Sequence, residues 1–323
     1  MAKTQAGYRR ESNSVTLHWS EMNRRQFARN LTGSVLSAPA LGLGASAAQS
    51  SEPKLAAAVS YQLSVMLWTV FRDLPFEQRL AKVAAAGYRN VELVGEYSKW
   101  SDADFERANA GRKRLGVRFD CTAGLKHGVG NPTDRDALLA EFGTTLPIMG
   151  RLDCPAMIIM SGNIVPGLSF EAQKQSCVDG LKALAQVVEG KKIGGEPVRL
   201  LLENIDPEEN PKYFLTSVAH GFEIVKAVGH PQVQFCYDLF HEQIAEGNLI
   251  EKLEKNIQHV GLVHIADVPG RHKPGTGEIN YANIYRKLRE LTYNRVVAME
   301  FLPTGDPVEE LRAAREMAIT DTK

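Results

Sequence analysis

Short apolar runs alternate with longer segments of helical pattern along the chain from residue 60 onward. Several of the runs, such as 156–160, are apolar throughout, which is typical of strands buried on both faces. Between the runs, apolar residues recur at the spacing of one helix face, as over 75–86. Strands are predicted at 61–68, 90–94, 117–121, 156–160, 198–203, 233–239, 260–266 and 296–301.

Capping residues mark several of the intervening helices. Ser101 and Asp104 resemble a capping box, and Asp306-Pro307 is an N-cap followed by proline at the first helical position. Gly87 stands where a C-terminal cap belongs. Besides the helices beginning at Ser101 and Asp306, helices are predicted at 75–86, 134–149, 170–189, 211–229, 249–257 and 281–291.

This order of elements predicts the fold. Eight strands, each followed by a helix, over about 260 residues, are the size and order of a (β/α)₈ TIM barrel. An open doubly wound sheet is the rival architecture, but neither a G-x-G-x-x-G motif nor a P-loop follows the first strand. No linker-like change of composition follows residue 60, so we predict one barrel domain over residues 51–323.

Residues 1–50 have a different composition and are interpreted as an export signal and linker. Arg24-Arg25 is followed by Phe27, a mildly apolar stretch and an A-x-A site at Ala45-Ser46-Ala47. The paired arginines are typical of a twin-arginine signal, which predicts contact with that export machinery and a periplasmic or otherwise exported location. The alternative is a disordered tail with an accidental arginine pair.

Composition narrows the class of partner. The chain of 323 residues has a formal net charge of zero and 44% hydrophobic residues, as in an ordinary globular protein. Neutral balance disfavours nucleic acid, and no long apolar run predicts stable membrane insertion. The sequence is compatible with a homo-oligomer and with a monomer. The four cysteines lack C-x-x-C spacing and are predicted to form no disulfide: Cys121, Cys154, Cys177 and Cys236.

The last four predicted strands each end in a residue type that binds metals. These residues are Glu203, Asp238, His264 and Glu300. In a TIM barrel the carboxyl ends of the strands form the active-site face, so the four side chains should converge. Three converging carboxylates repel one another, and a divalent cation would offset that cost. Oxygen ligands with one imidazole suit Mn²⁺, Mg²⁺ or Co²⁺, with Zn²⁺ as a further candidate.

Taken singly, each of these residues also has an ordinary structural interpretation. Glu203 or Glu300 would pair with an arginine, and His264 would be a hydrogen-bonded core histidine. As a set at the same relative position along their strands, they favour a metal site. In such a site the metal binds the carbonyl and hydroxyl oxygens of a substrate, and the two glutamates move protons on it. We therefore predict Glu203 and Glu300 as catalytic, without ranking them. The chemistry is aldose–ketose isomerisation, or epimerisation if the proton returns to the opposite face.

Two segments stand out: Asp238-Leu239-Phe240-His241 with Glu246-Gly247-Asn248-Leu249, and the run from His264-Ile265-Ala266-Asp267 through Arg271 to Tyr281. They resemble the hydroxypyruvate isomerase family, within the xylose-isomerase-like barrel superfamily. The resemblance spans about residues 60–315. It implies a metal held by Glu203, Asp238, His264 and Glu300, and substrate oxygens held by His241 and Arg271. Members of this family often carry glutamine where this chain has His264, whereas ketose 3-epimerases have histidine.

The predicted function is therefore a metal-dependent aldose–ketose isomerase, similar to hydroxypyruvate isomerase, that acts on a small sugar or hydroxy-keto acid through an enediolate. A ketose 3-epimerase, and a lyase or hydrolase of oxidised sugars, are the alternatives. A sugar-binding barrel without catalysis and the AP endonuclease branch of the superfamily are disfavoured. Loop residues Lys126, His127, Gly128 and Asn163 either line the pocket or are ordinary loop residues. Glu92 either pairs with Lys126 or contacts substrate.

Overall fold

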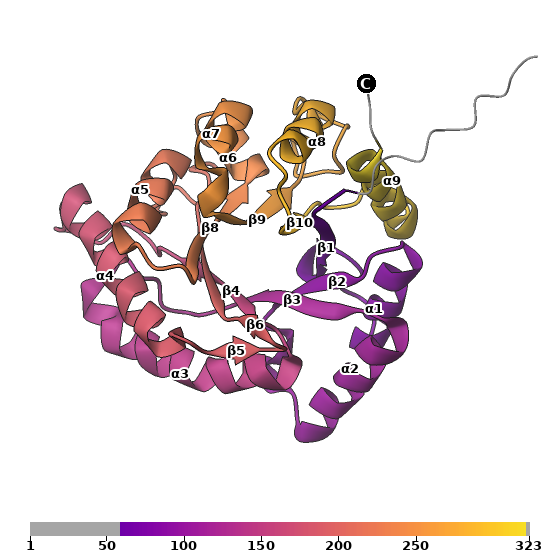
Figure 1. The fold of residues 1–323 in the computed structure, drawn as a ribbon, viewed down its shortest axis with the longest axis horizontal. Coiled ribbons are helices and arrows are strands. Elements are labelled where there is room, and N and C mark those ends of the chain that lie inside the picture. The colour runs from indigo at the N-terminus through magenta and orange to yellow at the C-terminus, as the bar shows by residue number, and fades with distance from the viewer. Residues whose placement is uncertain (1–58, 321–323) are drawn as a thin grey trace, which may run out of the picture. The chain divides into compact units, whose positions relative to one another are not determined.

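A computed structural model describes residues 59–320 and confirms the predicted barrel. Eight parallel strands close into a ring, and helices surround it (Figure 1). The strands follow one another in the order β1, β10, β9, β8, β7, β4, β3, β2 around the ring. Their bounds are β1 Gln62–Met66, β2 Asn90–Val94, β3 Arg118–Ala123, β4 Ala156–Met160, β7 Arg199–Glu203, β8 Val233–Asp238, β9 Val260–Ile265 and β10 Val296–Met299.

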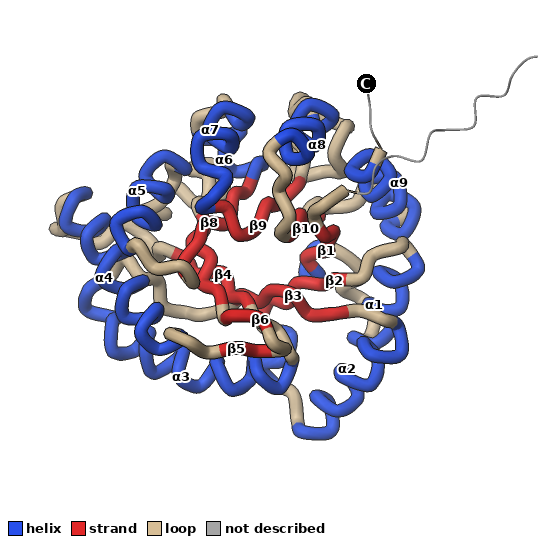
Figure 2. Tube along the Cα trace, viewed as in Figure 1, coloured by secondary structure: helices blue, strands red, loops and turns tan. Residues whose placement is uncertain are grey.

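The helices lie outside the strands, so each strand has one face toward a helix and one toward the barrel interior (Figure 2). Their bounds are α1 Phe76–Ala85, α2 Asp102–Leu115, α3 Arg135–Leu152, α4 Phe170–Val188, α5 Val218–Val228, α6 Leu239–Ala245, α7 Leu249–Asn256, α8 Tyr281–Glu290 and α9 Pro307–Ile319. The Ser101–Asp104 capping box is present, and Asp306 caps α9 with Pro307 in its first turn.

The predicted helix over 211–229 is wrong at its start. Helix α5 begins at Val218, after an N-cap at Ser217. The preceding residues cross to the β4 loop, where Tyr213 forms an isolated antiparallel bridge with Asn163. Pro211 resembles a first-turn proline, but tertiary hydrogen bonds hold this segment as a loop, including Phe214 N–H to Gly162 O at 3.0 Å.

Two further elements have no counterpart in the prediction. Helix α6 follows β8 without an intervening loop, because the Asp238 carboxylate caps it immediately. Strands β5 Lys192–Ile193 and β6 Glu196–Pro197 form a small antiparallel hairpin apart from the barrel. Both elements are too short to show the periodicity that identifies a helix or strand.

The apolar core has two parts. The larger part fills the space between strands and helices, and the smaller one fills the barrel interior with side chains such as Met66, Ile158, Leu201 and Leu262. The four cysteines are free and buried. Polar side chains also enter the interior, notably the fully buried Glu92. Above this filled interior lie the carboxyl ends of the strands, where Glu203, Asp238, His264 and Glu300 form a group called the rim below.

The predicted export signal and the linker to residue 50 lie outside the described residues. Between residues 59 and 320, no helix is both long enough and apolar enough to cross a membrane.

Candidate active site

The four residues predicted as metal ligands converge at the carboxyl ends of adjacent strands. Glu203 ends β7, Asp238 ends β8, His264 is the penultimate residue of β9, and Glu300 follows β10. All four are buried, and one potential ligand atom from each lies within 4.8 Å of the others. This convergence follows from the parallel strand order, since neighbouring strands deliver their last residues to one edge.

The orientation of His264 is well defined. Its Nδ1 lies 2.7 Å from Glu300 Oε2, 3.2 Å from Glu203 Oε1 and 3.9 Å from Asp238 Oδ2. Its Nε2 points the other way, 3.0 Å from Glu92 Oε2. Nδ1 is therefore the nitrogen that shares a space with the three rim carboxylates.

The electrostatics of the rim reflect crowded, buried carboxylates. Burial raises the pKa of Glu203, and the neighbouring His264 offsets this only in part. Burial also acts to raise the pKa of Glu300, but Arg271 and His264 outweigh it and hold that pKa well below its usual range. The carboxylates therefore depend on nearby positive charge, as ligands of a cation do.

The donor set fits a divalent metal. Three carboxylates and one imidazole nitrogen are ligands that Mn²⁺, Mg²⁺, Co²⁺ and Zn²⁺ accept. Glu300 Oε2 is buried and makes no hydrogen bond, although Arg271 and His264 contact it by charge. Such an oxygen retains capacity to bind a cation.

Arg271 and His241, which the family resemblance implies as substrate residues, lie beside this group. Arg271 Nη2 is 2.9 Å from Glu300 Oε2 and 3.4 Å from Asp238 Oδ2, and Nη1 is 2.8 Å from Glu209 Oε2. His241 Nε2 is 3.2 Å from Arg271 Nη1. Arg271 has a left-handed backbone, with φ of 57°, a strain that often accompanies functional positions.

The D-x-x-H spacing has a local cause. Asp238 Oδ1 accepts hydrogen bonds from the backbone N–H groups of Phe240 and His241, at 2.7 and 3.0 Å. These bonds start α6 and place the His241 ring beside the rim, where its Nδ1 lies 2.6 Å from Asp206 Oδ2. Burial acts to lower the pKa of His241, but Asp238 and Asp206 raise it to about 9.

Several residues of the site were missed by the sequence reasoning. Trp68 donates from Nε1 to Glu300 Oε1 at 2.9 Å, and Asp206 and Glu209 contact His241 and Arg271. Trp68 lies just past the end of β1, so its position could have identified it. Asp206 and Glu209 lie in the long loop after β7, where no periodicity gives a signal. Glu92 contacts His264, a partner not anticipated.

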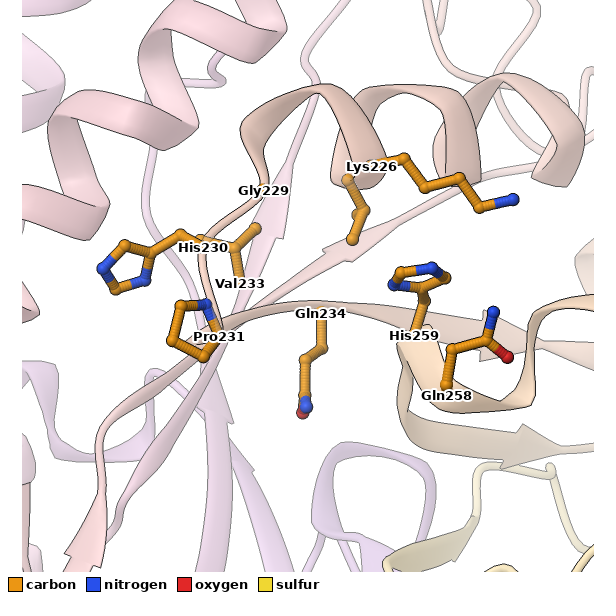
Figure 3. Close-up of a pocket in the computed structure, with 9 residues that line it drawn as sticks. Lys226, Gly229, His230, Pro231, Val233, Gln234, Gln258 and His259 are labelled. Atoms are coloured by element: carbon orange, nitrogen blue, oxygen red, sulfur yellow. The ribbon is translucent and has the colours of Figure 1, made fainter.

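A cavity of about 480 Å³ lies over the ends of β3 and β4, and Lys126, Gly128 and Asn163 are among the residues that line it. Its wall also includes Tyr213, whose hydroxyl donates to the backbone oxygen of Glu203 at 3.2 Å. A separate hollow of about 340 Å³ lies at the opposite end of the barrel, around His230 and His259 (Figure 3). A third cavity, of about 460 Å³, is lined by Asp206, Glu209 and Phe240, which contact His241 and Arg271, so it adjoins the candidate site directly.

The fold and this rim define a TIM barrel with a candidate metal site at the carboxyl ends of its strands, and comparison with known proteins gives the same fold. Residues 80–319 match the xylose isomerase-like TIM barrel family, and the chain belongs to that family. Two curated relatives are each 30% identical: a 2-oxo-tetronate isomerase of Haemophilus influenzae, matched over 76% of this chain and 95% of its own, and a putative hydroxypyruvate isomerase of Danio rerio, over 73% and 88%. A D-psicose 3-epimerase structure from Clostridium cellulolyticum matches with a TM-score of 0.68 at 20% identity, covering 80% of this chain and 98% of its own, which shows the shared fold.

Proposed function

We propose that this protein is a divalent-metal-dependent isomerase that interconverts an aldehyde and a ketone on a small hydroxy-keto acid or sugar. The observation that carries this proposal is the convergence of Glu203, Asp238, His264 and Glu300 within 4.8 Å at the carboxyl edge of the barrel. The names of its relatives, hydroxypyruvate isomerase and 2-oxo-tetronate isomerase, support the same reaction class.

Glu203, Asp238, His264 and Glu300 would hold the metal. A bound divalent ion polarises carbonyl and hydroxyl oxygens and so acidifies the C–H bond between them. One of the two glutamates would remove that proton. The C–H electron pair would then form the C=C bond of an enediolate, while the carbonyl π pair moves to its oxygen. The other glutamate would deliver a proton to the former carbonyl carbon, and the hydroxyl proton would pass to the former carbonyl oxygen, so that the carbonyl moves by one position.

His241 and Arg271 would orient the substrate. A guanidinium binds a carboxylate in a fork geometry, which suits the acid group of hydroxypyruvate or a 2-oxo-tetronate. Arg271 also stacks over Phe240 and Trp68, with its guanidinium carbon 5.0 and 5.7 Å from the two ring centres. These two ring contacts restrict where the guanidinium lies.

Substitution of the two glutamates by glutamine tests their proposed acid and base roles. Glu203→Gln and Glu300→Gln are each expected to lower kcat at least about 100-fold, since a positioned acid or base contributes roughly that much. Glu251→Gln is the matched control, because Glu251 is half exposed on α7, where it pairs with Lys255 and Asn248. Steady-state kinetics with hydroxypyruvate and a 2-oxo-tetronate measure the effect. Full activity in either site variant contradicts the assignment.

A ketose 3-epimerase is the second candidate. The observation that favours it is His264 itself, since the resemblance associates histidine at this position with epimerases and glutamine with hydroxypyruvate isomerases. Assay with ketohexoses separates the two, because epimerisation inverts a carbon while the carbonyl stays in place. An epimer formed faster than any aldose–ketose product would favour this alternative.

We also propose that the chain is exported through the twin-arginine pathway. The Arg24-Arg25 pair and the Ala45-Ser46-Ala47 site support this. Arg24→Lys with Arg25→Lys is expected to retain the protein in the cytoplasmic fraction, while the unchanged chain is recovered outside it. Immunoblots of cell fractions measure the distribution, and equal export of both chains would contradict the proposal.

A further inference from the structure

Glu92 is a buried carboxyl that the proposed chemistry does not use. It lies on β2 with no exposed surface, and its Oε2 is 3.0 Å from His264 Nε2. Its second oxygen, Oε1, is buried and has no hydrogen-bond partner. A carboxyl in such a place is costly, since burial without full pairing is unfavourable, so its contact with His264 requires an explanation.

The contact crosses the inside of the barrel. Strands β1 and β10 separate β2 from β9 in the ring. At the level of His264 these two strands carry small residues, Ala298 and Ser64, which are paired in register with each other and with His264. Glu92 is paired in register with Met66, two residues beyond Ser64 on β1, so its side chain reaches the imidazole obliquely across these strands. The arrangement is therefore built by four strands together.

The geometry determines which nitrogen of His264 is free for a cation. Nδ1 faces the carboxylates of Glu203, Asp238 and Glu300, and Nε2 faces Glu92. A neutral imidazole that binds a metal through Nδ1 carries its hydrogen on Nε2. In a dry interior that N–H needs an acceptor, and a carboxyl oxygen of Glu92 lies 3.0 Å from Nε2. The thiol of Cys236 is a further group that contacts the ring.

We propose that Glu92 is a positioning residue for the metal site: its carboxyl accepts the Nε2 hydrogen of His264 and so presents Nδ1 to the ion. Such hydrogen bonds to a ligating histidine fix its tautomer and ring orientation and increase its basicity. The inference rests on the metal site of the proposed function, but not on the identity of the substrate.

The test measures metal binding in the absence of substrate. The full chain is stripped of metal and titrated with Mn²⁺, and free Mn²⁺ is followed by electron paramagnetic resonance. Glu92→Leu, which has no acceptor, is expected to weaken Mn²⁺ binding about 10- to 100-fold. Glu92→Gln keeps an amide oxygen that can accept the same hydrogen, so its loss should be smaller. A Mn²⁺ affinity that falls in the order Glu92, Glu92→Gln, Glu92→Leu indicates that residue 92 acts as a hydrogen-bond acceptor.

Asp120→Asn is the matched control. Asp120 is also a buried carboxyl of the barrel interior with one unpartnered oxygen, but its hydrogen bond comes from Ser64 Oγ at 2.8 Å and not from His264. Its substitution should leave the Mn²⁺ affinity unchanged. Circular dichroism and thermal unfolding of each variant establish that the fold is intact. Wild-type affinity in folded Glu92→Leu, or an equal loss in Asp120→Asn, would overturn the proposal.

A second measurement covers the case in which Glu92→Leu does not fold. Nitrogen-15 NMR of the histidine rings in the Zn²⁺-loaded wild-type chain is expected to show His264 with hydrogen on Nε2, identified against His264→Gln. Hydrogen on Nδ1 would refute the positioning role. Both measurements are independent of turnover: a protein that shows this dependence on Glu92 but no isomerase activity refutes the proposed function and leaves the positioning role intact.

Discussion

At the scale of single residues, the two carboxylate oxygens of Asp238 have different partners. Oδ1 accepts the backbone N–H groups that start α6, and Oδ2 lies among the rim groups, 3.4 Å from Arg271 Nη2. The local cap therefore fixes the rotamer of a predicted metal ligand, which reduces the entropy lost when an ion binds. The same cap positions His241, so one carboxylate organises two site residues.

Asp120 supplies a prediction about pH. Burial, followed by the charge of Glu92, raises its pKa from 3.8 to about 8. Because the unfolded chain releases this proton near its ordinary pKa, the folded state binds one more proton between these values. Stability should therefore fall as pH rises from 3.8 to about 8, by up to about 1.4 kcal/mol per pH unit from this group.

Asp120→Asn removes that titration and keeps an oxygen for the Ser64 hydroxyl. Its unfolding free energy, measured by urea denaturation at several pH values, should exceed that of the wild type by an amount that grows toward pH 8. A difference that stays constant or shrinks over this range would contradict an Asp120 pKa raised by burial.

Residue positions also show what the sequence could predict. Glu203, Asp238, His264 and Glu300 were identifiable because each stands at the end of an apolar run, and the fold sends those ends to one edge. Asp206 and Glu209 were not, because a loop has no periodicity that reports where its side chains point. The contact between Glu92 and His264 could not be predicted either, since it crosses the barrel and does not follow from spacing along the chain.

At the scale of elements, the strands were predicted closely and the connections were not. The runs at 90–94 and 156–160 match β2 and β4 to the residue. For β4 the reason is burial on both faces, which leaves an uninterrupted apolar signal. The start of α5 was placed too early, since Pro211 suggested a first turn that long-range hydrogen bonds override. Helix α6 is short and depends on its Asp238 cap.

The packing of α5 on β8 gives a prediction at this scale. Glycine inside a helix usually costs about 0.5–1 kcal/mol relative to alanine. At Gly221, however, an added Cβ would overlap the ring of Phe235 on β8. Gly221→Ala should therefore lower the unfolding free energy by about 1–3 kcal/mol, because overpacking outweighs helix propensity.

Gly143 in α3 is the control for that substitution, because a Cβ there meets no atom within 4 Å. Gly143→Ala should stabilise the chain by about 0.5–1 kcal/mol. Denaturant unfolding measures both variants. Stabilisation by Gly221→Ala would show that α5 does not pack as closely on β8 as described.

At the scale of the whole molecule, the barrel makes a site from residues far apart in sequence. Glu203 and Glu300 are almost 100 positions apart, yet both lie within 3.2 Å of His264 Nδ1. The alternation of strands and helices was sufficient to predict this closure, because eight repeats of one unit bring strand ends into a ring. Loop side chains such as Arg271 and Lys126 are a different case, because the strand pattern does not determine their positions.

Solvent-hydrogen exchange tests the central claim most directly. The metal-stripped chain is incubated in D₂O with hydroxypyruvate or a 2-oxo-tetronate, before and after addition of Mn²⁺, and proton NMR follows the carbons beside the carbonyl. The account predicts deuterium at those carbons only with metal, and at a rate lowered at least about 100-fold in the variant, Glu203→Gln or Glu300→Gln, that lacks the base. Exchange and turnover that persist after chelation, or in both glutamate variants, would contradict it.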